Sequence, residues 1–178
     1  IAILGNVIAV NDPIRMAEEI AMLDCFSGGR IISGFVRGTA VETLQAGIDP
    51  TENRGRFEEA HDLIIKCWTT PGPFRWEGRY YQHRVVNPWV LPMQKPHPPI
   101  WFPGGSSPES VVWAARHHYT YINLGALMDL TRELKQFAQF ISICRWLELI
   151  YKERLASLEN APFSAPWARK RCHVAQHY

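Results

Sequence analysis

The sequence predicts an α/β fold of about four parallel β-α units. Apolar runs that suit strands buried on both faces alternate with segments whose apolar residues recur at helical spacing. Strands that alternate with helices pair in parallel, either in a doubly wound open sheet or in a (β/α) barrel. No Gly-x-Gly-x-x-Gly follows the first strand, which disfavours the dinucleotide-binding form of the open sheet.

The first strand and helix open the chain. Residues 1–10 form a mostly continuous apolar run, which predicts a parallel strand buried on both faces. Asn11-Asp12-Pro13 supplies an N-cap and a first-turn proline for a helix over residues 13–26. Ser27-Gly28-Gly29 then ends that helix.

A second unit follows directly. Residues 30–36 predict a strand that ends at Arg37-Gly38, and a polar loop runs through Asp49-Pro50. Residues 56–68 then place their apolar side chains on one helical face. Residues 69–99 are rich in proline and aromatic residues, and they predict a hairpin-like insertion outside the repeating unit.

Two further strands complete the predicted sheet. They cover residues 100–103 and 119–124, with a helix over residues 107–117 between them and another helix from about residue 129. Beyond residue 136, an amphipathic helix is expected over residues 140–158, and the last twenty residues suit an irregular tail.

The step from the third strand into its helix has the form of an anion-binding turn. Gly104 and Gly105 let an anion approach the backbone, and Ser107 with Pro108 predicts an N-cap and first helical residue. Free N–H groups and the helix dipole favour a phosphate at such a start, together with the hydroxyls of Ser106, Ser107 and Ser110. An ordinary capped helix after a glycine turn explains this segment alone equally well.

Composition excludes several classes of partner. The net charge of +2 comes from scattered charges and indicates no nucleic acid or anionic membrane. The four cysteines are far apart and the seven histidines lack metal-ligand spacing, so neither a metal site nor a disulfide framework is expected. No apolar run approaches the ~20 residues of a membrane helix. We therefore expect a cytoplasmic protein with reduced thiols, and a start inside a strand without Met suggests a piece of a longer protein.

Several sequence blocks, in order, resemble the bacterial luciferase-like, flavin-dependent monooxygenases over roughly residues 1–136. The blocks are Asn11 to Asp24, Ser27 to Arg30, Gly34 to Gly38, Asn53 to Glu59, Trp68-Thr69, Phe74 to Tyr81, Gln94 to Trp101 and Gly104 to Ser110. The resemblance implies a partial (β/α)8 TIM barrel over residues 1–136, with residues 69–99 inserted and residues 137–178 divergent.

The resemblance also implies a reaction. Members of this family bind reduced FMN, usually delivered by an NAD(P)H-dependent flavin reductase, and use O2 to oxygenate a small organic substrate. The expected partners are therefore that substrate and that reductase, with association into homo- or hetero-oligomers because half a barrel leaves strand edges open.

The same resemblance assigns cofactor-binding roles to six residues. Arg37 is similar to the family's cationic contact to the flavin phosphate, and a guanidinium suits that task. The turn would close on the same phosphate, and Asn6 would lie near the flavin ring. The six residues are Asn6, Arg37, Gly105, Ser106, Ser107 and Ser110. Arg37 as a solvated strand end, and Asn6 bonded to nearby backbone, are the alternatives.

No catalytic residue is assigned, because the flavin itself carries the chemistry in this family. His83, His117 and His118 are the histidines nearest the predicted site in sequence, and structural or solvated roles are favoured for them. Three functions stay open: a fragment of an FMN-dependent monooxygenase, a non-catalytic flavin- or phosphate-binding half-barrel that self-associates, and another α/β enzyme with a phosphate ligand.

Overall fold

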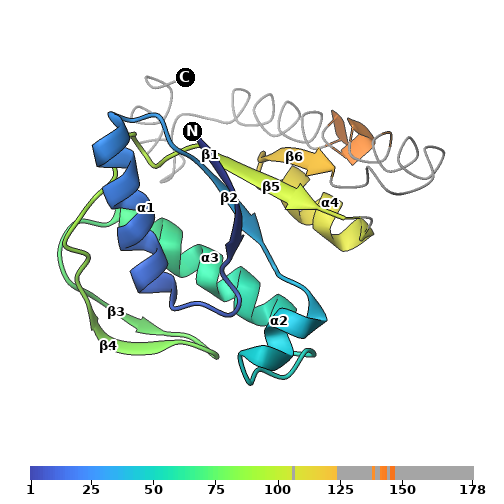
Figure 1. Cartoon of the computed structure of the whole chain (residues 1–178), viewed down its shortest axis with the longest axis horizontal. Coiled ribbons are helices and arrows are strands. Elements are labelled where there is room, and N and C mark those ends of the chain that lie inside the picture. Colours follow the sequence, from blue (N-terminus) through green and yellow to red (C-terminus); the bar gives the residue numbers. More distant parts are fainter. Residues whose placement is uncertain (106, 124–137, 139–140, 144, 147–178) are drawn as a thin grey trace, which may run out of the picture.

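Four parallel strands form the central sheet, as the sequence predicts (Figure 1). The computed structural model describes residues 1–105, 107–123, 138, 141–143 and 145–146. The strands follow one another in the order β1-β2-β5-β6, and each neighbouring pair is parallel. Their bounds are Ala2–Val7 (β1), Ile32–Val36 (β2), Ile100–Gly104 (β5) and Thr120–Asn123 (β6).

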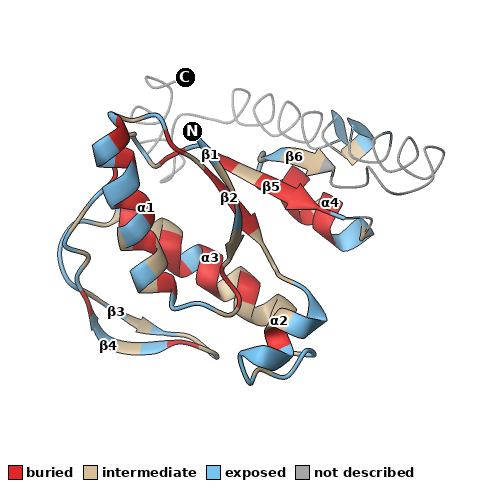
Figure 2. Ribbon diagram, viewed as in Figure 1, coloured by how far each residue is buried: buried red, intermediate tan, exposed pale blue. Residues whose placement is uncertain are grey.

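Helices connect the successive strands and lie over one shared core. Figure 2 shows buried residues on α1, α3, α4, β2 and β5, and side chains from these elements pack in a single cluster. A doubly wound sheet reverses its strand order and carries helices on both faces, whereas this order never reverses. The arrangement is that of a partial barrel. The helices are Pro13–Ser27 (α1), Ala40–Gln45 (α2), Asn53–Thr69 (α3) and Pro108–Arg116 (α4).

The predicted ends of the first unit are confirmed for α1 and corrected for β1. The Asp12 side chain accepts a hydrogen bond from the N–H of Arg15 at 2.8 Å, and Gly28 ends α1 in the left-handed region at φ 66°. β1 stops at Val7 although the apolar run continues to residue 10. Ile8 and Ala9 are fully buried, so their apolar character serves core packing beyond the strand.

The segment after β2 is partly helical, where the sequence analysis expects only a loop. Thr39 and Glu42 form a capping box, in which each side chain bonds the backbone N–H of the other residue, and this starts α2. The pattern Thr-x-x-Glu was visible in the sequence but has too short an apolar run behind it to predict a helix. α3 likewise begins at Asn53, three residues before the predicted start.

The predicted helices beyond residue 123 fall largely outside the described residues. Residues 138, 141–143 and 145–146 are helical, in agreement with part of the expected helix over 140–158. Leu124, the helix expected from residue 129 and the irregular tail lie outside the described residues. Within the described part of the chain, no helix has the length and apolarity that crossing a membrane requires.

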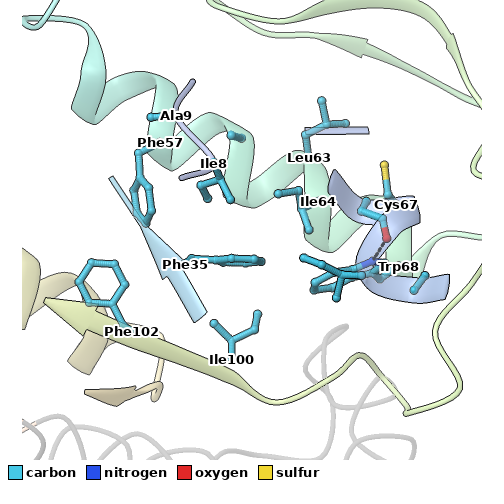
Figure 3. Packing of buried hydrophobic residues seen from close by; sticks show 14 of the residues in the cluster. Ile8, Ala9, Phe35, Phe57, Leu63, Ile64, Cys67, Trp68, Ile100 and Phe102 are labelled. Atoms are coloured by element: carbon cyan, nitrogen blue, oxygen red, sulfur yellow. Dashed lines mark hydrogen bonds between the residues drawn. The ribbon is translucent and has the colours of Figure 1, made fainter. Parts of the chain in front are cut away.

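Phe35 of β2 lies at the centre of the core (Figure 3). Its ring stacks on Trp68 with centroids 6.1 Å apart and contacts the edge of His61 at 6.2 Å. The Trp68 Nε1–H donates to the carbonyl of Ala17, which ties α3 to α1. On the other side of the cluster, Phe57 packs edge-to-face on Phe102 of β5. Aromatic side chains of α3 therefore hold this helix against both the sheet and α1.

His61 is a buried titratable group in this core, 4% exposed. Its Nδ1 lies 2.9 Å from the carboxylate of Asp62, and its Nε2 lies 2.7 Å from the hydroxyl of Tyr119. A neutral imidazole satisfies both bonds, because Nδ1–H donates to the carboxylate and Nε2 accepts from the phenol. Burial lowers the pKa of His61 and outweighs the opposing hydrogen bond from Asp62.

Acid is expected to destabilise the fold through His61. The unfolded chain takes up a proton near pH 6.5, the ordinary histidine pKa, while the folded chain resists it until a lower pH. The contribution of neutral His61 to the free energy of unfolding is therefore fully present above about pH 6.5. Below that pH, the free energy of unfolding falls by up to about 1.4 kcal/mol per pH unit. Urea unfolding at pH 7.5 and 5.5 measures this loss. The same pH dependence in His61→Gln would assign it to other groups.

The insertion forms the predicted hairpin and lies against α3 (Figure 1). β3 (Phe74–Glu77) and β4 (Gln82–Val86) pair antiparallel in a sheet of their own. The carboxylate of Glu59 on α3 accepts the indole N–H of Trp76 and the backbone N–H groups of residues 79–81. Gly78 leaves room for this carboxylate, because a Cβ there would lie 1.7 Å from Glu59 Oε1.

Candidate functional site

A cavity of about 420 Å³ lies at the carboxyl ends of β1, β2 and β5. In a (β/α) barrel these strand ends meet on one face, where the loops build ligand sites. Of the five predicted site residues that the structure describes, three line the cavity: Arg37, Gly105 and Ser110. The described residues of the lining are Leu4, Gly5, Val7, Val36, Arg37, Gly38, Thr39, Glu42, Phe102, Pro103, Gly104, Gly105 and Ser110.

Arg37 and Ser110 meet at this cavity although 73 residues separate them. Arg37 follows the last residue of β2, and Ser110 lies in the first turn of α4, where it is 4% exposed. The guanidinium Nη2 donates a hydrogen bond to the Ser110 Oγ at 3.3 Å. The predicted convergence of the second strand end and the glycine-serine turn is thus present.

The guanidinium of Arg37 is half-buried, and the carboxylates of Glu109 and Glu58 attract its charge only from a distance. Burial, and then repulsion from Arg54, lower the pKa of the guanidinium, although arginine stays protonated at neutral pH. Among the described residues, no carboxylate lies within salt-bridge distance of it. Such a cation favours an anionic ligand, and its planar donors match the oxygens of a phosphate.

The glycine turn takes its shape from Tyr121 of β6. A Cβ on Gly104 would lie 2.7 Å from the Tyr121 ring, so only glycine fits beneath that ring. The Tyr121 hydroxyl donates to the carbonyl of Gly105, and Gly105 is exposed with open space around its Cα. An anion can therefore approach the backbone at Gly105 without meeting a side chain.

The serine positions agree with the prediction only in part. Ser107 occupies the N-cap position of α4 with extended dihedrals, φ −76° and ψ 120°. Its hydroxyl, however, donates to the Glu109 carboxylate and caps no backbone N–H. The two polar side chains satisfy each other, which corrects the predicted capping role. Ser106 lies outside the described residues.

Asn6 is near the site without lining the cavity. It pairs with Phe35 across β1 and β2, and its Nδ2 donates to the Ser33 Oγ at 3.3 Å. Ser33 is fully buried, so the Asn6 side chain satisfies a polar group between the two strands. Contact between Asn6 and a ligand stays a prediction.

Thr39 and Glu42 line the cavity and were missed by the sequence analysis. The Glu42 carboxylate accepts hydrogen bonds from the backbone N–H and hydroxyl of Thr39, which lower its pKa. A carboxylate therefore lies in the same cavity as the Arg37 guanidinium. Recognition of the Thr39–Glu42 capping box in the sequence would have placed these side chains beyond the end of β2.

None of the three histidines considered from the sequence lines this cavity. His83 lies on the hairpin, and the His117 ring contacts the carbonyl of Trp113 through Nδ1 at 2.8 Å. His117 instead borders a hollow of about 500 Å³ between α3 and α4. Both positively and negatively charged side chains line that hollow, so its charge favours neither an anionic nor a cationic ligand. These side chains are Arg54, Glu58, Asp62, Glu109 and Arg116.

Comparison with known proteins gives the ancestry of this arrangement. The profile of the luciferase-like monooxygenases matches residues 5–142, which include β2, β5, β6, the second half of β1 and every described residue of the cavity lining except Leu4. The chain belongs to this family. The resemblance in the sequence blocks and the assignment to a partial TIM barrel are thereby confirmed.

Three curated relatives match part of the chain. It is 36% identical over 113 residues to an uncharacterised protein of Sinorhizobium fredii, covering 63% of this chain and 32% of that protein. It is 33% identical over 92 residues to the oxygenase component of a flavin-dependent trigonelline monooxygenase of Acinetobacter baylyi, covering 50% and 25%. It is 31% identical over 117 residues to an FMNH2-dependent dimethylsulfone monooxygenase of Pseudomonas putida, covering 64% and 32%.

A solved structure gives the same fold. Monooxygenase RslO1 from Streptomyces bottropensis superposes with a TM-score of 0.68 at 26% identity, over 77% of this chain and 42% of that one. In the three curated relatives, the part that matches this chain is a quarter to a third of the length of each protein.

Proposed function

We propose that this chain is part of a flavin-dependent monooxygenase that uses reduced FMN and O2 to oxygenate a small organic substrate. Support comes from the family, from a relative named as FMNH2-dependent and from the cavity at the strand ends. Another relative is named as an oxygenase component, which favours a separate NAD(P)H-dependent flavin reductase as the partner.

The observation that carries the proposal is that Arg37, which has no salt bridge among the described residues, lies beside the Ser110 hydroxyl and the open Gly105 turn. These donors fit a phosphate monoester, because a guanidinium, a hydroxyl and accessible backbone surround one volume. Arg37 and the turn from Gly105 to Ser110 would hold the FMN phosphate. The Glu42 carboxylate is an acceptor and suits a hydroxyl donor such as the ribityl chain.

Reduced flavin would supply the reaction with O2, and the protein would contribute binding, orientation and exclusion of water. One part of the lining is apolar and would exclude water beside the polar groups. It consists of Leu4, Val7, Val36 and Phe102. No described side chain of the cavity is assigned as an acid or base. The substrate-binding loops of a barrel are spread over all eight strand ends, and the described part of this chain contains four of them.

Replacing Arg37 with alanine is expected to weaken FMN binding by about 1.5–3 kcal/mol, roughly ten- to 100-fold, the range of a charge-assisted hydrogen bond. Riboflavin lacks the phosphate, so its affinity should change little. Titration calorimetry with both flavins measures the two effects. Arg15→Ala is the control, because Arg15 is exposed on α1 and paired with Glu19. Equal FMN affinity in wild type and Arg37→Ala would remove Arg37 from the site.

A further inference from the structure

Asn53 joins two segments that border the cavity, although it does not line the cavity itself. It is the first residue of α3, and its side-chain Nδ2 donates to the Arg37 carbonyl at 3.1 Å and to the Thr43 Oγ at 2.6 Å. An amide NH2 has two hydrogens, so both bonds can form at once. The start of α3 is thereby bonded to the end of β2 and to α2.

The bond to Arg37 acts where the backbone changes direction. β2 ends at Val36, and Gly38 has a left-handed φ of 80°. A Cβ on Gly38 would lie 2.5 Å from the Val7 Cγ1, so the turn is tightly packed against β1. Fixing the Arg37 carbonyl between these two points fixes the orientation of the residue from which the guanidinium projects.

The bond to Thr43 extends the same support to Thr39, which also lines the cavity. Thr43 is 1% exposed, and its hydroxyl donates to the Thr39 carbonyl at 2.9 Å. Thr39 lines the cavity and caps α2. One amide therefore connects both ends of the short segment that carries Arg37, Gly38 and Thr39.

The next residue along α3 contacts the first turn of α4. The Arg54 Nη2 donates to the Glu109 carbonyl at 3.5 Å, and Glu109 immediately precedes Ser110. The first turn of α3 thus contacts both sides of the gap that the bond from Arg37 to Ser110 closes. The contacts from Asn53, at 3.1 and 2.6 Å, are shorter than the one from Arg54.

We propose that Asn53 is a positioning residue for the phosphate contact: it holds Arg37 in the orientation that reaches Ser110 and the ligand. The inference rests on the proposed function, because it concerns the FMN phosphate. A role limited to general support of the loop would lower the affinity for FMN and riboflavin alike. Positioning through Arg37 affects only the ligand that carries the phosphate.

The test compares the ratio of the riboflavin Kd to the FMN Kd in the 178-residue chain. Asn53→Ala is expected to lower this ratio about fivefold, the effect of one neutral hydrogen bond, with riboflavin affinity within about twofold of wild type. Thr43→Val is the matched control, since it removes the other acceptor of Asn53 together with the bond to the Thr39 carbonyl and leaves the bond from Asn53 to Arg37. Loss of the bond to Thr39 acts on both flavins alike, so Thr43→Val should keep the wild-type ratio. Thermal melts confirm that each variant is folded.

A double-mutant cycle then locates the effect. In the Arg37→Ala background, Asn53→Ala should change FMN affinity less than about twofold, because the side chain that it positions is gone. A wild-type ratio in Asn53→Ala, or an undiminished loss in the Arg37→Ala background, would overturn the positioning role alone. A wild-type chain that shows no preference for FMN over riboflavin would overturn the proposed phosphate site, and this inference with it.

Discussion

Replacing Phe35 with alanine is expected to lower the free energy of unfolding by about 3–5 kcal/mol, the usual cost of deleting a buried aromatic ring. Phe35 is fully buried in the middle of β2. Its ring fills the space between Trp68 and His61 of α3, so its loss leaves a cavity where the helix packs on the sheet. Urea unfolding followed by circular dichroism measures the change.

A loss of this size is a large part of the stability of an ordinary domain, about 5–15 kcal/mol. Phe35 also lies on β2, two residues before Arg37, which directly follows the end of that strand. We therefore expect Phe35→Ala to weaken FMN and riboflavin binding together, in contrast to Arg37→Ala, which acts on the phosphate alone. Comparing the two variants therefore distinguishes a residue that supports the strand from a residue that contacts the ligand.

Phe26→Ala is the matched control for Phe35→Ala. Phe26 is 82% exposed near the end of α1, so the same deletion should change stability by no more than about 0.5 kcal/mol. A similar cost at both positions would mean that Phe26 is covered in solution, or that the ring of Phe35 is not packed as described.

The parallel sheet was predictable because its signal is local. Each strand is a short apolar run between turn residues, and Gly28 and Asp12 end and begin α1 as their residue types require. No local signal in the sequence distinguishes a barrel from an open sheet. The distinction depends on the strand order β1-β2-β5-β6, which no periodicity in the sequence encodes.

The departures also have physical causes. The run over residues 1–10 was too long for a strand because Ile8 and Ala9 are apolar for core packing. Ser107 has the sequence of an N-cap, but the neighbouring Glu109 competes for its hydroxyl. α2 was missed because six residues give too little periodicity to recognise.

The turn chemistry of residues 104–110 predicted one part of the candidate site, whereas Arg37 and Asn6 entered only through the family resemblance. Arg37 and Ser110 carry no sequence signal for each other, and their meeting requires β2 and β5 to be neighbours. The supporting bonds of Asn53 were beyond prediction. An asparagine at the start of a helix ordinarily suggests a cap, whereas this one bonds residues 37 and 43 in other elements.

The hairpin depends on one side chain more than on its own two strands. An isolated two-stranded hairpin is marginally stable in water. Here Glu59 accepts four N–H groups, and Arg56 and Lys66 of α3 lie over aromatic rings of the insertion. The position of residues 74–86 is therefore set from α3, the same helix whose first turn supports Arg37.

Replacing Glu59 with alanine is expected to destabilise the protein by about 2–4 kcal/mol, because hydrogen bonds to a charged group contribute about 1.5–3 kcal/mol each and are not additive. The three backbone N–H groups of residues 79–81 lose their acceptor. Urea unfolding gives the total, and hydrogen exchange locates it. Amides of β3 and β4 should lose protection, while those of β1 and β2 keep theirs until global unfolding.

Glu58→Ala is the control for this effect, because it removes the adjacent carboxylate of the same helix. Glu58 is paired only with Arg54 across one turn, at 2.8 Å, and its side chain is 44% exposed. Such a pair contributes about 0.3–0.5 kcal/mol. If Glu58→Ala cost as much as Glu59→Ala, total charge on α3 would account for the loss. If Glu59→Ala left the exchange of residues 79–81 unchanged, the insertion would be held by its aromatic contacts with Arg56 and Lys66 instead.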